Sequence, residues 1–165
     1  MSDEFLELVQ FEGMPPLVFG LDLASVLRVV SEWGEARELP ETPSGTRRFH
    51  VQDNLHGLDL YPTFEGVNSL TSIEVWRPDG SYGDGSMCRI RFMEVDLFRL
   101  RASDVIKRLS ALGFAGDLSD PYFPVYDQIA LGFNRSGGDD CDDEGMSLHF
   151  RSVLIGPPGY YGTGV

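Results

Sequence analysis

The chain has 165 residues, enough for one ordinary domain or for two small ones that share a core. Its 42% hydrophobic and 12% aromatic residues are typical of a folded globule and argue against disorder. The net charge of −13 at pH 7 opposes binding to nucleic acid or to an anionic membrane, and it favours encounters with basic partners.

We expect neither a secretory signal nor a membrane span. Its start, Met1-Ser2-Asp3-Glu4, is acidic, and no apolar run approaches the roughly 18–20 residues of a membrane span. The two cysteines, Cys88 and Cys141, fit neither a disulfide framework nor a zinc motif. We therefore expect a cytoplasmic protein.

The first half of the chain predicts a strand, a helix and three further strands. An apolar strand at about 15–21 leads into a helix at about 23–33. The helix has an apolar stripe formed by Val26, Leu27, Val30 and Trp33. Alternating apolar and polar residues then predict half-buried antiparallel strands over 47–53, 57–64 and 70–77.

The second half predicts the same order of elements. A strand at 88–99 precedes a helix at 102–112, with Ser103 as its expected N-cap. Short strands are expected over 122–127, 129–134 and 147–155. Gly34 and Gly113 follow the two helices, where a left-handed C-cap residue is expected.

The two halves are also similar in sequence. At an offset of 79, residues 18–34 align without a gap on 97–113, and residues 78–83 align on 157–162. Residues 49–53 resemble 123–127 at a nearby offset. We interpret this as an internal duplication. It predicts an α+β fold of two tandem diverged repeats, 1–83 and 84–165, each a helix packed on a small antiparallel sheet and both sharing one compact domain.

Motifs for catalysis or metal binding are weak. Of the three histidines, His50, His56 and His149, the first two are six residues apart and could share one face, but a zinc site needs a third ligand and no convincing one is nearby in the sequence. The acidic run from Asp139 to Gly145 resembles a calcium loop when counted from Asp140, until the twelfth position, which is Arg151 instead of a bidentate acid. We find no nucleophile elbow and no phosphate-binding loop. The sequence therefore predicts no metal, no cofactor and no enzymatic activity.

Two groups of residues are candidates for contact with a partner protein. The first is an acidic tract between two predicted strands, expected to be a solvated loop: Asp139, Asp140, Asp142, Asp143 and Glu144. The second comprises tyrosines in Gly-rich turns: Tyr82, Tyr160 and Tyr161. Exposed tyrosines give a large, rigid contact area and suit an interface, but they are equally able to fold back over a sheet edge.

One segment resembles a known family. Phe19-Gly20-Leu21-Asp22, followed by Val26-Leu27 and Gly34, resembles the Phe-Gly-Met-Thr, Val-Leu, Gly pattern of the tandem-repeat β-lactamase inhibitor proteins. The outer-membrane assembly lipoproteins of the same fold share this pattern. Leu21 and Asp22 depart from the usual Met-Thr, and the paired cysteines and export signal of that family are lacking, so no binding residue is transferred.

In size, charge and expected location the chain is also similar to small acidic immunity proteins, which neutralise bacterial polymorphic toxins. The sequence therefore predicts a protein-binding inhibitor, a cytoplasmic immunity protein that neutralises a basic toxin such as a nuclease through its acidic surface. One alternative is a small-molecule-binding or hydrolytic α+β domain with a pocket between its two sheets. Another is a structural accessory protein.

Overall fold

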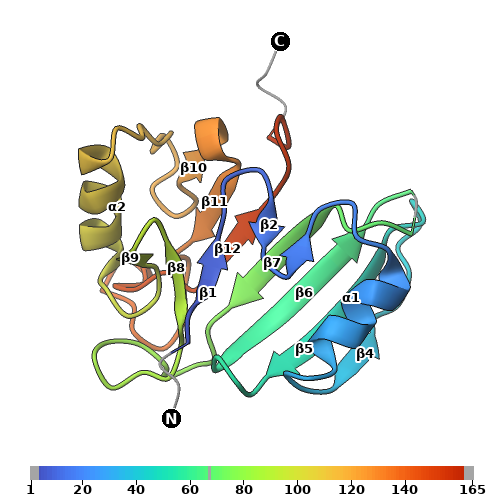
Figure 1. Cartoon of the computed structure of the whole chain (residues 1–165). Coiled ribbons are helices and arrows are strands. Elements are labelled where there is room, and N and C mark those ends of the chain that lie inside the picture. The colour runs from blue at the N-terminus through green and yellow to red at the C-terminus, as the bar shows by residue number, and fades with distance from the viewer. Residues whose placement is uncertain (1–3, 67, 162–165) are drawn as a thin grey trace.

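The computed structural model describes residues 4–66 and 68–161 (Figure 1). The helices are α1 (Leu23–Val30), α2 (Ala102–Ala111) and the 3-10 helix η1 (Asp127–Ile129). The strands are β1 (Leu6–Leu8), β2 (Gly13–Met14), β3 (Leu17–Val18), β4 (Ala36–Glu38), β5 (Arg47–Asp53), β6 (Leu58–Phe64), β7 (Ser72–Trp76), β8 (Ile90–Phe92), β9 (Val95–Asp96), β10 (Val125–Tyr126), β11 (Leu131–Asn134) and β12 (Ser152–Ile155).

The largest sheet is antiparallel and has seven strands, in the order β10-β11-β12-β7-β6-β5-β4. The pair formed by β12 and the central strand β7 joins the two halves of the chain, because Ile73 of β7 lies opposite Ile155 of β12 and Trp76 lies opposite Ser152. The predicted fold, two repeats that each pack a helix on a separate small sheet, is therefore wrong. Strands from residues 1–83 and 84–165 form one continuous sheet, and the expected boundary falls in the loop between β7 and β8.

Edge pairing gives the physical reason for this merger. A three- or four-stranded sheet leaves two rows of unpaired backbone donors and acceptors at its edges. Pairing β7 with β12 removes one edge from each half and adds a ladder of four residue pairs. It also extends the apolar face over which both halves share a core.

The alternating strands of the first half are confirmed, with shorter bounds for β7. In β6 and β7 the apolar side chains Leu58, Leu60, Ile73 and Val75 point into the core. The residues between them are half-buried on the opposite face. This opposite face carries Asp59, Tyr61, Glu74, Trp76, Gly132, Asn134 and Leu154.

Two smaller sheets stand where single long strands were predicted. Residues 15–21 contribute only β3 of the β2–β3 hairpin, whose turn contains Pro15 and Pro16. Residues 88–99 contain the β8–β9 hairpin, in which Met93 and Glu94 adopt positive φ at the turn. Strand β1 pairs in parallel with β8 and so ties the N-terminal segment to the second half.

Each helix covers a different region, as Figure 1 shows: α1 lies over the β4–β6 side of the large sheet, and α2 lies beside β9. Helix α1 is capped by Asp22, whose carboxylate accepts from the Ser25 N–H at 2.7 Å. Ser103 is not the cap of α2, because that helix begins at Ala102 and Arg101 occupies its N-cap without a side-chain bond.

The two glycines that follow the helices have different roles. Gly113 has φ of +95° and so adopts the predicted left-handed conformation. Gly34 has no positive φ, and a Cβ atom there would lie 1.8 Å from the Gln52 carbonyl oxygen. Glycine at position 34 therefore permits close backbone contact between the end of α1 and the end of β5.

Candidate functional site

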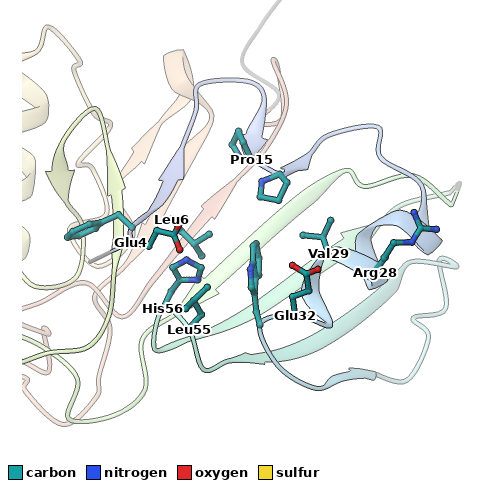
Figure 2. Close-up of a pocket in the computed structure, with 11 residues that line it drawn as sticks. Glu4, Leu6, Pro15, Arg28, Val29, Glu32, Leu55 and His56 are labelled. Carbon is teal, nitrogen blue, oxygen red and sulfur yellow. The ribbon is translucent and has the colours of Figure 1, made fainter. Parts of the chain in front are cut away.

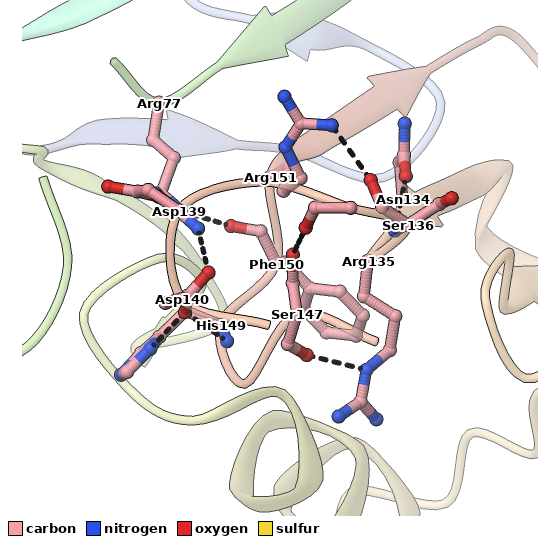
Figure 3. A network of polar contacts seen from close by, with 11 residues as sticks. Arg77, Asn134, Arg135, Ser136, Asp139, Asp140, Ser147, His149, Phe150 and Arg151 are labelled. Carbon is pink, nitrogen blue, oxygen red and sulfur yellow. Dashed lines mark hydrogen bonds and ion pairs between the residues drawn. The ribbon is translucent and has the colours of Figure 1, made fainter. Parts of the chain in front are cut away.

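The acidic tract belongs to the long segment between β11 and β12, and the Arg77 side chain extends toward Asp139 and Asp140 of this tract (Figure 3). Arg77 follows β7 directly, and its side chain is 1% exposed. Its guanidinium donates to Asp140 at 2.7 Å, to Asp139 at 3.3 Å and to the Phe150 carbonyl at 2.9 Å. One buried cation thus fixes two carboxylates and the backbone that precedes β12.

Asp140 is the centre of this cluster. Besides Arg77, its carboxylate accepts from the backbone N–H of His149 at 3.0 Å and from His149 Nδ1 at 2.8 Å. Tyr82 stacks on the His149 ring with centroids 4.9 Å apart, and the Arg77 guanidinium lies 5.0 Å from the Tyr82 ring centroid. The loop after β7 and the acidic tract are therefore packed together.

The predicted acidic residues have different environments. Asp140 is buried in the Arg77 cluster and is not available to a partner. Asp139 is partly exposed, and its pKa is lowered by hydrogen bonds from backbone N–H groups and from Arg77, which outweigh its desolvation. Asp142 is exposed and accepts from the N–H groups of Glu144 and Met146. Asp143 and Glu144 are exposed at the tip of the loop.

The three predicted tyrosines pack against the protein. Tyr82 covers His149 and Arg77, as described above. The Tyr161 ring lies on Gly132, where a Cβ atom would be 2.2 Å from its hydroxyl oxygen, and Tyr160 packs in the same way on Gly156. Burial raises the pKa of the Tyr161 phenol. Tyr160 and Tyr161 thus cover part of the large sheet, which was the alternative interpretation of these residues.

A neighbouring segment was missed in the sequence. Residues 117–123 lie against the acidic tract, because the Tyr122 hydroxyl donates to the Glu144 carbonyl at 2.8 Å and Arg135 N–H donates to the Tyr122 carbonyl at 2.9 Å. In this segment Leu118 and Phe123 are 45% and 46% exposed. The Asp-Leu-Ser-Asp-Pro run at 117–121 signals turns, but nothing local in it indicates where the segment packs.

Together the two segments form a surface that we name the acidic loop surface. It comprises the exposed residues Asp117, Leu118, Asp120, Phe123, Asp142, Asp143 and Glu144. The carboxylates of Asp117 and Asp120 accept from the N–H groups of Ser119 and Tyr122, so their turns are locally fixed. These hydrogen bonds lower the pKa of Asp117, which keeps it charged. The surface therefore combines fixed negative charge with two exposed apolar side chains.

Each histidine contacts one aspartate. His50 pairs with Asp59 at 2.8 Å on the open face of the large sheet, and His149 pairs with Asp140. His56 is buried and pairs with Asp53 at 2.7 Å. Within residues 4–66 and 68–161, no group of three or more His, Cys, Asp or Glu side chains is arranged to hold a metal ion.

A pocket of about 320 Å³ lies between β1, the β2–β3 turn, α1 and the β5–β6 turn (Figure 2). His56 lines it together with Glu4, Glu32 and Trp33. This pocket is remote in sequence from the acidic loop surface, and it was not predicted as a set of residues.

No protein family, curated protein or solved structure matches this chain. Among the described residues, no helix has the length and apolar character needed to cross a membrane.

Proposed function

We propose that this protein binds a basic protein and inhibits it, as a cytoplasmic immunity protein that neutralises a basic toxin such as a nuclease. The observation that carries the proposal is the acidic loop surface, in which two adjoining segments expose Asp117, Asp120, Asp142, Asp143 and Glu144 together with the apolar Leu118 and Phe123. Its charge has the same sign as the net charge of the chain, −13.

The arrangement of charge supports a basic partner. Clustered carboxylates raise the rate of encounter with cationic proteins and disfavour acidic ones. Affinity in such interfaces comes mainly from a few well-packed apolar or aromatic contacts surrounded by a polar rim. Phe123 and Leu118 are suited to be these contacts, and the acidic side chains are suited to be the rim.

The rigidity of the surface supports it as well. The Arg77–Asp140 ion pair and the Asp142 hydrogen bonds fix the acidic tract before any partner arrives. A surface fixed in its binding conformation loses little conformational entropy on association, and tight inhibitors benefit from this.

The experiment is affinity capture from the native host, identification of the captured protein, and assay of the purified pair. We expect a basic partner whose own activity falls to near zero at one equivalent of this protein. The Kd is expected to rise by about tenfold or more between 50 and 300 mM NaCl, because rim charges are screened.

Matched variants locate the interface. Asp143→Asn/Glu144→Gln removes two charges from the acidic loop surface and is expected to weaken binding by about tenfold, mainly through a slower association rate. Glu12→Gln/Glu41→Gln removes two exposed charges elsewhere and is expected to leave binding unchanged. Phe123→Ala is expected to accelerate dissociation. A partner that is acidic, or whose affinity ignores salt and all of these variants, contradicts the proposal.

A further inference from the structure

The pocket beside α1 has the size and lining of a small-ligand site. Its volume of about 320 Å³ lies at the lower end of the range for such sites. Most of its wall is apolar or aromatic: Phe5, Leu6, Pro15, Pro16, Val29, Trp33 and Leu55. Its polar residues are Glu4, Arg28, Glu32 and His56.

His56 is held in a fixed orientation by Asp53. The Asp53 side chain is fully buried. Its carboxylate accepts a hydrogen bond from His56 Nδ1 at 2.7 Å, and it accepts from the backbone N–H groups of Leu55 and His56 at 3.0 Å each. Because a carboxylate only accepts, Nδ1 must carry the proton, and in the neutral ring Nε2 is then a hydrogen-bond acceptor. No hydrogen bond from the described residues to Nε2 is seen, and Nε2 is not one of the buried polar atoms without a partner, so it is open to the pocket that His56 lines.

The other polar groups near His56 are acceptors too. Figure 2 shows Glu4 beside His56 and Glu32 farther along the pocket, with Pro15 on the opposite side. Arg28 lies at the end of the pocket away from His56 in this view. The pocket therefore offers three hydrogen-bond acceptors: the carboxylates of the exposed residues Glu4 and Glu32, and the imidazole nitrogen of the buried His56.

We propose that this pocket binds a small organic cation, a primary ammonium or guanidinium group carried on a short apolar stem. The cationic head has several N–H donors and matches the acceptors Glu4, Glu32 and His56 Nε2. The stem lies against the proline and leucine side chains, and the Trp33 ring adds a favourable contact for a cation. An anionic head would be repelled by these two carboxylates, and a purely apolar ligand would gain nothing from them.

This inference goes beyond the proposed protein–protein interaction and does not depend on it. It also gives a ligand class to the small-molecule alternative. The Asp53–His56 pair by itself would be explained as a stabilised turn, but a turn does not require two further carboxylates around an open pocket.

The test uses butylguanidine as the probe and its uncharged analogue butylurea as the control. The sequence contains two tryptophans, so in a Trp76→Phe variant the fluorescence reports Trp33 alone. We expect butylguanidine to change this fluorescence saturably and butylurea to bind at least about tenfold more weakly, because charge-assisted hydrogen bonds to carboxylates are lost.

Two single substitutions assign the response to the pocket. Glu32→Gln and Glu4→Gln in the Trp76→Phe background are each expected to weaken butylguanidine binding by about tenfold. Glu12→Gln removes an exposed charge outside the pocket and is expected to have no effect. Melting temperatures close to that of the parent verify that the variants are folded. No saturable response, equal binding of butylurea, or unchanged affinity in both pocket variants overturns the proposal.

Discussion

Arg77 has a side chain that is 1% exposed, and both of its ion-pair partners belong to the segment between β11 and β12. If Arg77 is replaced by Met, Asp140 keeps its burial but loses its cation. Removing one member of a buried pair typically costs about 3–5 kcal/mol, because the remaining charge is left uncompensated. We expect urea unfolding of Arg77→Met to show a loss of this size.

Two comparisons separate the ion pair from simple truncation. The double variant Arg77→Met/Asp140→Asn is expected to be more stable than Arg77→Met alone, because it no longer has the buried, unpaired carboxylate of Asp140. Lys107→Gln, at an exposed position of α2, is expected to change stability by less than about 0.5 kcal/mol. A loss below about 1 kcal/mol for Arg77→Met would show that Arg77 does not hold the loop.

A second prediction at this scale concerns Tyr161 in alkaline solution. Burial raises the pKa of Tyr161 in the folded chain, so the folded state keeps the phenol neutral after the unfolded state has ionised it. The unfolded chain then binds fewer protons than the folded one, and stability falls as pH rises above about 10. Burial also raises the pKa values of Tyr126 and Tyr61, which act in the same direction.

The measurement is the free energy of unfolding in urea at pH 8.0 and pH 10.5. We expect Tyr161→Phe to lose less stability between these two values than the natural chain, because one of the responsible phenols is removed. At pH 8.0 the two proteins should be similar, since the Tyr161 hydroxyl makes only a long 3.4 Å bond to the Leu154 carbonyl. An identical loss in both proteins argues against a buried, neutral Tyr161.

At the scale of elements, the contact between α1 and β5 depends on the absence of a side chain at position 34. A Cβ atom there would be 1.8 Å from the Gln52 carbonyl oxygen and 2.9 Å from its carbon, both backbone atoms that cannot rotate away. We expect Gly34→Ala to destabilise the protein by about 2–3 kcal/mol through forced backbone displacement. Differential scanning calorimetry measures the loss.

Gly85 provides the matched control for this substitution. No atom lies within 4 Å of a Cβ placed there, and its φ is not in the left-handed region. Gly85→Ala should therefore leave stability unchanged or raise it slightly, through a less flexible unfolded chain. Equal effects of the two substitutions would remove the steric explanation.

The elements that the sequence predicted well are those with a local signal. Buried and less buried residues alternate over 49–53 in β5 and over 58–61 in β6, and both helices have a clear apolar stripe. The hairpins β2–β3 and β8–β9 were missed because their turns contain Pro15-Pro16 and the positive-φ pair Met93-Glu94 inside otherwise apolar runs. A continuous apolar run does not distinguish one strand from two short ones.

The candidate site was predicted in part, and distance in sequence explains the remainder. Asp142, Asp143 and Glu144 are exposed as a solvated acidic loop requires. Asp140 is buried because it pairs with Arg77, which is 63 residues away, and no local pattern predicts such a pair. Similarly, Tyr160 and Tyr161 fold back because Gly156 and Gly132 leave room for their rings.

At the scale of the whole molecule, the sequence similarity between the two halves can be compared with the pairing of β7 and β12, the strands that join them. Positions 73 and 76 correspond to 152 and 155 at the offset of 79 found in the sequence. The observed partners are Ile73 with Ile155 and Trp76 with Ser152. Adding 79 to the β7 members of these two pairs gives the β12 members of the same two pairs, so β7 and β12 are equivalent strands that pair symmetrically. The sequence similarity thus related the last strands of the halves but did not indicate that they pair with each other.

The last prediction concerns the net charge of −13, which arises from 26 acidic and 13 basic side chains. Several of the basic residues are already paired, as Arg47 is with Glu38 and Arg91 with Glu7. Such exposed pairs typically contribute only about 0–1 kcal/mol each. The excess acidic residues repel one another over the whole surface of the folded chain, and unfolding relieves this repulsion.

Screening should therefore stabilise the protein. Raising NaCl from 20 to 300 mM shortens the Debye length and weakens repulsion between distant carboxylates more than it weakens the buried Arg77–Asp140 pair. We expect Tm to increase by about 2–4 °C, equivalent to roughly 1 kcal/mol for a chain of this size. In a variant carrying Glu12→Gln, Glu41→Gln, Asp143→Asn and Glu144→Gln, the net charge is less negative and the increase should be smaller. A Tm that falls with salt would mean that surface ion pairs outweigh the repulsion.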